Sequence, residues 1–309
     1  MTIAANEICK TSRREATRLV LALGAAALLP GSGRAQTPAS AMTRPVPSTG
    51  VALPMVGLGT AALYNTDNEA SRRSAQDVLQ ALVAGGGKLV DTGSTYGDAE
   101  AVLGAAVPAS GLRDKLFIAT KLEAPDAAEL KRSLARLKVD KLDLLQVHNV
   151  RNAQQSLAQF RRWKQEGVCR YVGITSTFKG DYAALEAVLK REKPDFLQVD
   201  YSLDNREAEQ RLLPLAAEVK AAVLTALPFG RNRLFRAVRG KPLPEWAAEF
   251  DATTWAQFFL KFLLGHPAVT AVIPGTANAA HMADNLGAAR GRLPDATQRR
   301  RMVEFVEAL

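Results

Sequence analysis

The stretch Leu142-Asp143-Leu144-Leu145-Gln146-Val147-His148 is a short apolar run that ends in a histidine. A run of this length fits a strand buried inside a parallel sheet. Amphipathic segments separate this run from others of the same kind. Eight strands that alternate with helices over about 260 residues predict an α/β fold, a single (β/α)8 TIM barrel. The eight apolar runs begin near Met55, Lys88, Leu116, Leu142, Tyr171, Phe196, Ala222 and Val269.

The N-terminal segment has a different pattern. Basic residues that include the pair Arg13-Arg14 precede an apolar stretch over 19–29, and small residues up to Ala35 follow it. This order predicts an export signal of the twin-arginine type over residues 1–35. Its apolar part is too short to span a bilayer, which needs about 20 residues. We therefore expect a periplasmic or otherwise exported protein with no stable membrane insertion once the signal is cleaved.

We expect a linker over 36–48 and one barrel domain over 49–309 to follow the signal. The composition of the chain limits its binding partners. The 309 residues carry a formal net charge of +9. They show no basic stripe interleaved with base-stacking aromatic residues, so we expect no nucleic-acid partner. Two cysteines and three histidines are too few for a Cys/His cluster, so no metal site is predicted. We expect a monomer.

Polar residues at the strand ends mark a candidate site, because barrel enzymes place catalytic side chains there. The second apolar run ends in Asp91 and leads into Tyr96, the third ends in Lys121, and the fourth ends in His148. Four ionisable groups are thus expected at one mouth of the barrel. A buried charge is costly unless it is paired, so Asp91 and Lys121 are expected to pair.

These residue types suit proton transfer to a carbonyl oxygen. An ammonium beside a phenol stabilises the phenolate, so Tyr96 can act as a general acid when charge builds on the oxygen. His148 can hydrogen-bond the same oxygen and orient it. Each residue alone has an ordinary structural explanation, such as a helix cap for Asp91 or a surface charge for Lys121. Their order on successive strands favours catalysis.

The motif Asp91-x4-Tyr96 with Lys121 and His148 resembles the catalytic tetrad of the aldo-keto reductase family. The resemblance covers nearly all of the chain after the expected signal, and Gly50–Thr60 is similar to the family's opening hairpin and first strand. It implies an N-terminal β-hairpin before the barrel. It also implies NAD(P)H-dependent reduction of an aldehyde or ketone to an alcohol by hydride transfer, with Tyr96 as the general acid.

The resemblance further implies a set of cofactor contacts. Segments 173–176 and 196–201 are similar to those that hold the carboxamide and the face of the nicotinamide. Segment 273–285 is similar to the adenosine-phosphate and adenine contacts, and two arginines after the seventh run could supply charge to the phosphates. The expected cofactor-binding residues are Gly59, Thr60, Thr175, Ser176, Gln198, Tyr201, Leu227, Phe229, Arg231, Arg233, Pro274, Gly275, Thr276, His281, Asp284 and Asn285.

The chain departs from the family at several of these places. Ala226 lies near the position where the family often stacks a tyrosine on the nicotinamide. Gly275 and His281 stand where a lysine and an arginine often hold the 2′-phosphate, and a neutral imidazole does not grip phosphate as a guanidinium does. The resemblance implies NADP(H) as the cofactor, and these two replacements leave NAD(H) as an alternative. Ala61 and Asn149 replace tryptophans, which predicts an open pocket for a small carbonyl substrate.

Two alternative interpretations compete with this one. The glycines of Gly57-Leu58-Gly59-Thr60-Ala61-Ala62 fit the G-x-G-x-x-A pattern of a Rossmann dehydrogenase, although Pro54 interrupts the preceding run. The other alternative is an exported nucleotide-binding barrel with a sensing or binding role and little turnover. Export favours it, because an exported reductase leaves the cytoplasmic pool that would recharge its cofactor.

Overall fold

The computed structural model describes residues 41–150 and 152–309. The expected export signal over 1–35 lies outside the described residues, as do the first five residues of the expected linker. The described residues belong to one compact unit.

Eight parallel strands run in chain order around one sheet, from β3 to β10. Parallel bridges Val56–Val272 and Gly59–Gly275 join its two edges and close it. The expected TIM barrel is confirmed, and the Rossmann alternative is wrong because the strand order is sequential and closed. The strands are β3 (Leu58–Gly59), β4 (Leu89–Asp91), β5 (Phe117–Leu122), β6 (Leu142–His148), β7 (Cys169–Ser176), β8 (Phe196–Asp200), β9 (Ala222–Ala226) and β10 (Val269–Val272).

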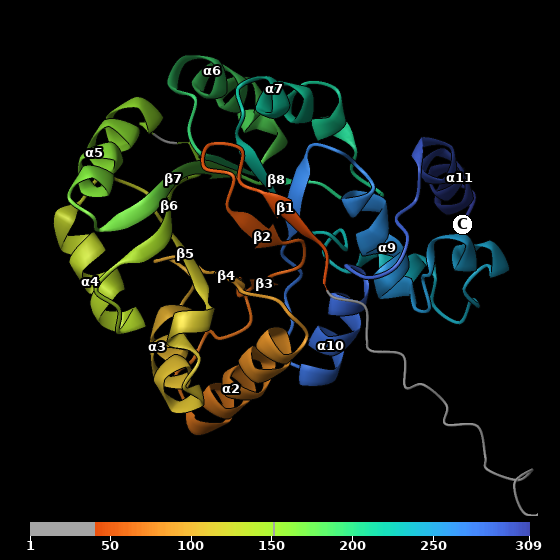
Figure 1. The fold of residues 1–309 in the computed structure, drawn as a ribbon, viewed down its shortest axis with the longest axis horizontal. Helices are drawn as coiled ribbons and strands as arrows, with labels where there is room; N and C mark the ends of the chain where they lie inside the picture. The colour runs from red at the N-terminus through yellow and green to blue at the C-terminus, as the bar shows by residue number, and fades with distance from the viewer. Residues whose placement is uncertain (1–40, 151) are drawn as a thin grey trace, which may run out of the picture. The chain divides into compact units, whose positions relative to one another are not determined.

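Helices surround the strands as an outer ring (Figure 1). Their apolar faces pack on the outward side chains of the sheet in one large core cluster. The first described helix ends at a run of glycines over 85–87, of which Gly85 is its C-cap. The helices are α2 (Glu69–Ala84), α3 (Ala99–Ser110), α4 (Ala127–Leu137), α5 (Ala153–Gln165), α6 (Tyr182–Glu192), α7 (Leu212–Glu218), α8 (Arg233–Ala237), α9 (Trp255–Leu264), α10 (Ala279–Gly287) and α11 (Ala296–Glu307).

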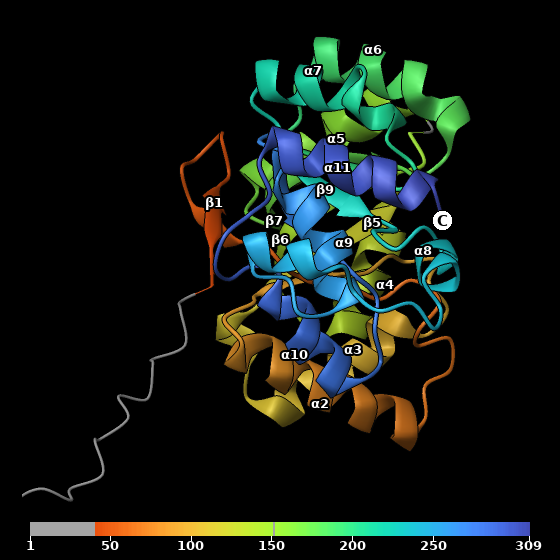
Figure 2. The ribbon, with the colours of Figure 1, turned by 90° about the vertical axis from the view of Figure 1, so that its right-hand side faces the viewer.

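The expected N-terminal hairpin is present as β1 (Thr43–Pro45) paired antiparallel with β2 (Ala52–Pro54). It lies at one end of the barrel, and α8 lies at the other (Figure 2). Strand β1 begins inside the stretch expected to be a linker. The folded unit therefore starts before residue 49, because the Arg44 guanidinium donates to the carbonyl oxygens of Leu264 and His266 at 2.7 and 2.8 Å and ties this proline-rich segment down.

The barrel interior is apolar at the hairpin end. Alternate side chains of the strands point inward and form a second core cluster with Val46 of the hairpin. The Tyr171 hydroxyl and Thr49 Oγ1 lie 2.7 Å apart and join this layer to the hairpin turn. The inward residues of this cluster include Leu89, Phe117, Leu144, Tyr171, Phe196 and Leu224. The end occupied by the hairpin is therefore filled, and a site can open only at the opposite end.

The described residues contain neither a membrane-spanning helix nor a cluster of metal-ligating side chains. No helix over 41–150 and 152–309 has the length and apolar character needed to cross a membrane. Within the same ranges, no three or more His, Cys, Asp or Glu side chains gather as a metal site would need.

Candidate active site

A polar layer lies two residues beyond the apolar layer on the same strands. Leu89 and Leu144 point inward, so the strand period of two also brings Asp91 and Gln146 inward, at the carboxyl ends of β4 and β6. Lys121 of β5 pairs in register with Gln146. Charged and amide groups therefore replace apolar ones within about 7 Å along the barrel axis.

Asp91 and Lys121 form a buried ion pair. Lys121 Nζ donates to Asp91 Oδ2 and to the carbonyl oxygen of Thr92, both at 2.6 Å. The side chains are only 3% and 1% exposed. Burial by itself lowers the pKa of Lys121, but the attraction of Asp91 and of Tyr96 and the hydrogen bonds outweigh it, so the pKa of Lys121 lies above its usual value. The ammonium is thus charged at neutral pH.

Tyr96 and His148 lie against this pair. Lys121 Nζ is 4.8 Å from the centroid of the Tyr96 ring. The Tyr96 ring meets the His148 ring edge-on at 5.6 Å between centroids, and the hydroxyl of Thr95 lies 3.4 Å from His148 Nδ1. The structure therefore brings together all four residues expected to be catalytic.

Two glutamine side chains complete the polar layer. Gln146 Nε2 donates to Asp91 Oδ1 at 3.1 Å, and Gln198 Nε2 donates to Asp91 Oδ2 at 3.1 Å. Gln146 Nε2 also donates to Gln198 Oε1 at 3.0 Å. Gln198 was expected in the site, but Gln146 was missed. A polar residue at an inward position of an otherwise apolar strand, two residues before His148, was the available signal.

Asp91 and Gln198 of the polar layer line a cavity of about 630 Å³, whereas Lys121 and Gln146 are not in its wall. Eleven of the expected residues line it, from seven strands or the loops after them. Phe178, which is 56% exposed, and Thr177 also line it and were not expected. The expected residues in its wall are Gly59, Thr60, Asp91, Tyr96, His148, Thr175, Gln198, Leu227, Phe229, Arg231 and Gly275.

Tyr201, Ser176 and Arg233 do not line this cavity. The Tyr201 hydroxyl donates to Glu209 and accepts from Arg299 Nη2 at 2.7 Å. Burial raises the pKa of this phenol far above its usual value. Ser176 Oγ donates to Asp181 at 2.6 Å, and Arg233 pairs with Asp204 at 2.7 Å. The structure engages these three side chains in local contacts.

The residues expected around the adenosine also lie outside the cavity wall. Asp284 accepts hydrogen bonds from Thr254 Oγ1 at 2.9 Å and from Gln257 Nε2 at 2.7 Å. The backbone nitrogen of His281 donates to Asn278 Oδ1 at the start of α10. The expected residues of this group are Pro274, Thr276, His281, Asp284 and Asn285. They follow β10 in the stretch 273–285, of which Ile273 and Gly275 lie in the wall.

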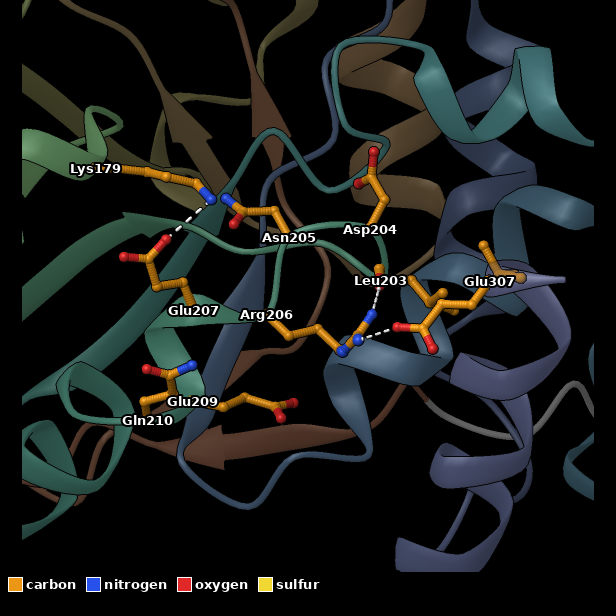
Figure 3. Close-up of a pocket in the computed structure, with 10 residues that line it drawn as sticks. Lys179, Leu203, Asp204, Asn205, Arg206, Glu207, Glu209, Gln210 and Glu307 are labelled. Carbon is orange, nitrogen blue, oxygen red and sulfur yellow. Dashed lines mark hydrogen bonds and ion pairs between the residues drawn. The ribbon is translucent and has the colours of Figure 1, made fainter. Parts of the chain in front are cut away.

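A second cavity, of about 820 Å³, lies beside residues 203–210 and the C-terminal helix (Figure 3). Its charged side chains all have ion-pair partners: Asp204 and Glu209 pair with Arg233 and Arg299 outside the cavity, and the other four pair with one another. Lys179 reaches Glu207 at 2.9 Å, and Arg206 pairs with Glu307 (Figure 3). None of the four tetrad residues lines it, so the barrel mouth is the candidate active site.

Comparisons with known proteins agree with this geometry. The model of the Aldo/keto reductase family matches residues 55–302. Methylglyoxal reductase YeaE of Escherichia coli is 29% identical over 246 residues, 76% of this chain and 85% of that protein. An aldo-keto reductase of Mycobacterium avium is 33% identical over 190 residues, 58% of this chain and 63% of that protein.

Solved structures show the same architecture. A crystal structure of an aldo/keto reductase from Klebsiella pneumoniae in complex with NADP and acetate superimposes with a TM-score of 0.71 at 26% identity, covering 83% of this chain and 93% of that one. The match of a family model to most of the chain, together with the tetrad at the mouth of a closed barrel, leads to one assignment. The chain belongs to the aldo/keto reductase family.

Proposed function

We propose that the protein reduces a small aldehyde or ketone to an alcohol with NAD(P)H, using Tyr96 as the general acid. The observation that carries the proposal is the buried Lys121–Asp91 pair, whose ammonium lies 4.8 Å from the centroid of the Tyr96 ring, and Tyr96 lines the open cavity. A buried, charged lysine against a phenol is the arrangement that general acid catalysis at a carbonyl oxygen needs.

The residues of the cavity fit a nicotinamide dinucleotide. The hydroxyl of Thr175 and the amide of Gln198 suit a carboxamide, and the guanidinium of Arg231 suits a phosphate group. A cavity of this size accommodates a ligand of ordinary small-molecule dimensions. The chemistry that the reduced dinucleotide supplies when bound is donation of a hydride to the carbonyl carbon. The NADP in the Klebsiella pneumoniae relative supports NADP(H) as the cofactor here.

The chain's own residues then manage the carbonyl oxygen. His148 orients the oxygen by a hydrogen bond, and Tyr96 gives up its hydroxyl proton as negative charge builds there. Lys121 stabilises the phenolate that Tyr96 leaves behind, and Asp91 keeps Lys121 charged and in place. The carbon gains two electrons and the oxygen gains the proton, so the product is an alcohol.

The resemblance to Escherichia coli methylglyoxal reductase supports small 2-oxoaldehydes as substrates. Ala61, Ala62 and Asn149 line the cavity. Their small side chains leave space at its mouth, and none of the three offers an aromatic ring on which a large aromatic substrate could stack. Methylglyoxal with NADPH is therefore the first pair to assay.

We also propose that the protein is exported before it acts. The support is the order of the N-terminal sequence, in which Arg13-Arg14 precede an apolar stretch and Ala35 follows it. A folded barrel with bound cofactor suits a twin-arginine route. Fractionation of cells that express the full chain tests this, and retention of a full-length protein in the cytoplasm would count against it.

The decisive experiment compares Tyr96→Phe with the matched change Tyr171→Phe. We expect Tyr96→Phe to lower kcat roughly 10²–10⁴-fold with methylglyoxal while NADPH still quenches fluorescence with the same affinity. Tyr171→Phe removes a hydroxyl at the closed end of the barrel and should leave kcat unchanged. Full turnover by Tyr96→Phe would refute the proposal. A single burst by the unchanged protein, without steady turnover, would favour the nucleotide-binding alternative.

The preference between NADPH and NADH can be measured separately, from their binding affinities. Titration with NADPH and NADH in parallel, followed by fluorescence quenching, should give tighter binding of NADPH. Equal affinities would mean that the positions taken by Gly275 and His281 do not select the 2′-phosphate.

A further inference from the structure

Gln146 carries a buried amide in strand β6, where the residues on either side of it, Leu145 and Val147, are apolar. It is 0% exposed, and its Nε2 group donates to both Asp91 Oδ1 and Gln198 Oε1. Its own Oε1 has no hydrogen-bond partner among the described residues. An unsatisfied buried acceptor is costly, so an apolar side chain of similar size would be less expensive if filling space were its only role.

The orientation of this amide is fixed by its partners. Turning it over would place Oε1 against Asp91 Oδ1 and Gln198 Oε1, which are both acceptors. Gly173, the register partner of Gln146 on β7, leaves the room that the side chain needs, because a Cβ there would lie 3.0 Å from Gln146 Cγ. Backbone and partners thus hold the amide in one arrangement.

Three hydrogen bonds close a ring through Asp91, Gln146 and Gln198. Within this ring, Asp91 Oδ1 accepts a hydrogen bond from Gln146. Asp91 Oδ2 accepts one from Gln198, and a further one from Lys121, which lies outside the ring. The hydrogen bond from Gln146 therefore partly neutralises the negative charge of the carboxylate that pairs with Lys121. It also determines that Gln198 turns Nε2 toward Asp91 and Oε1 toward β6.

We infer that Gln146 is a positioning residue that couples the proton-donating side of the site to the cofactor side. Through Asp91 it sets how strongly the carboxylate acts on Lys121 and Tyr96. Through Gln198 it sets which amide atoms remain to face the cavity. The inference rests on the proposed function, because it concerns the same acid and the same cofactor.

Gln146→Met tests it, since methionine has a similar length and no hydrogen-bonding amide. We expect kcat with methylglyoxal to fall about tenfold to a hundredfold, the loss expected from removing a hydrogen bond to a charged group. The alkaline limb of the kcat–pH profile should move upward by roughly half a unit, because a less neutralised Asp91 opposes formation of the phenolate. The Kd for NADPH, measured by fluorescence quenching without substrate, should rise about tenfold.

Two further variants make the result specific. Leu144→Met alters the same strand two residues earlier, among apolar side chains, and should leave both the pH profile and the Kd unchanged. Gln146→Glu keeps the shape but puts an acceptor against Asp91, so its activity should fall steeply as the pH rises and the new carboxyl ionises. This variant also serves if the methionine variant does not fold.

The inference is overturned if the Gln146 variants keep the unaltered pH profile and NADPH affinity, whatever happens to their melting temperature. That outcome differs from failure of the proposed function. If Tyr96→Phe retains full turnover, the function itself is wrong. If Tyr96→Phe is inactive while the Gln146 variants behave like the unchanged protein, only the positioning role is lost.

Discussion

Lys121 at the barrel mouth and Lys261 in helix α9 are two buried lysines in opposite electrostatic settings. Lys121 is 1% exposed and meets the carboxylate of Asp91 at 2.6 Å. Lys261 is 0% exposed and donates to the carbonyl oxygens of Arg290 and Arg292 at 2.6 and 2.8 Å. Both ammonium groups have short hydrogen bonds, but among the described residues only that of Lys121 has a counter-ion in contact.

The pKa values move in opposite directions for this reason. Burial dominates at Lys261 and lowers its pKa to about 8, although Asp251 attracts its proton. At Lys121 the carboxylate and the phenol outweigh burial, and the pKa rises. Hydrogen bonds to carbonyl oxygens therefore satisfy a buried ammonium without securing its proton. In the active site, contact with the carboxylate of Asp91 keeps the ammonium of Lys121 protonated.

The consequences for stability differ in sign. Lys121 contributes stability that is complete below its usual pKa of 10.5 and is lost as the pH rises through its higher folded value. Lys261 costs stability below about pH 8, and the cost disappears as the pH rises from 8 to 10.5. Variants at the two positions can therefore separate catalysis from structure.

Lys121→Met should have the largest effect. It removes the ammonium that stabilises the phenolate, so kcat should fall roughly 10²–10⁴-fold. It also leaves Asp91 buried with only amide donors, which should lower the free energy of unfolding by about 3 kcal/mol. Urea unfolding and steady-state assays measure the two losses. The exposed Lys131→Met is the control and should change neither. If Lys121→Met folds and retains its activity, Lys121 has no catalytic role and does not differ from Lys261 in that respect.

Asp91→Asn should make Lys121 resemble Lys261. The ammonium would keep the carbonyl of Thr92 but lose its counter-ion, so the pKa of Lys121 should fall. The amide nitrogen of the new side chain would also face a donor, Gln146 or Lys121. We expect kcat to drop about tenfold to a hundredfold at neutral pH, with a further decline as the pH rises. An unchanged pH profile would contradict the role given to Asp91.

The sequence predicted the site where the strand period and barrel geometry suffice. Asp91 and His148 end strands and Lys121 lies one residue before the end of β5, so their meeting follows from parallel strands in chain order. Gln146 follows from the same alternation but was overlooked. The role of Lys261 could not be predicted, because its partners are backbone carbonyl groups 29 and 31 residues away, beyond α10.

Tyr201 illustrates a misleading similarity. The segment 196–201 was expected to present this ring to the nicotinamide, and Gln198 does line the cavity. Phe196 and Gln198 point into the barrel, whereas Tyr201 shares the outward core cluster with Leu197 and Val199. An odd number of residues from an inward position leads to the other face of a strand. Strand alternation therefore places the Tyr201 side chain outside the barrel interior.

Lys261→Met should reveal the structural lysine through pH. The variant leaves two carbonyl oxygens without their donor, which should cost about 1–3 kcal/mol near neutral pH. The difference in unfolding free energy between the unchanged protein and the variant should then grow by up to about 3 kcal/mol from pH 8 to 10.5, because only the former sheds the cost of a buried charge. Urea unfolding at intervals of one pH unit measures this difference, in which other titrating groups cancel. A constant difference would mean that Lys261 does not titrate in this range. Turnover should be unaffected.

Asp251→Asn should have the smallest effect and should sharpen the same measurement. Asp251 has a φ of 57°, a conformation that asparagine adopts readily, and its Oδ2 accepts from the backbone nitrogen of Arg292 at 2.8 Å, a bond that an amide oxygen can keep. Its pair with Arg292 is largely exposed, so the loss of stability should be below about 1 kcal/mol.

The informative readout is the position of the pH step assigned to Lys261. Asp251 raises the pKa of that lysine, so the step should begin at lower pH in Asp251→Asn and stay in place in the exposed control Asp140→Asn. A step that stays in place in both variants would show that the carboxylate of Asp251 does not act on Lys261. Its two carbonyl partners and its burial would then account for the whole shift, and the contrast with Lys121 would rest on contact with a counter-ion alone.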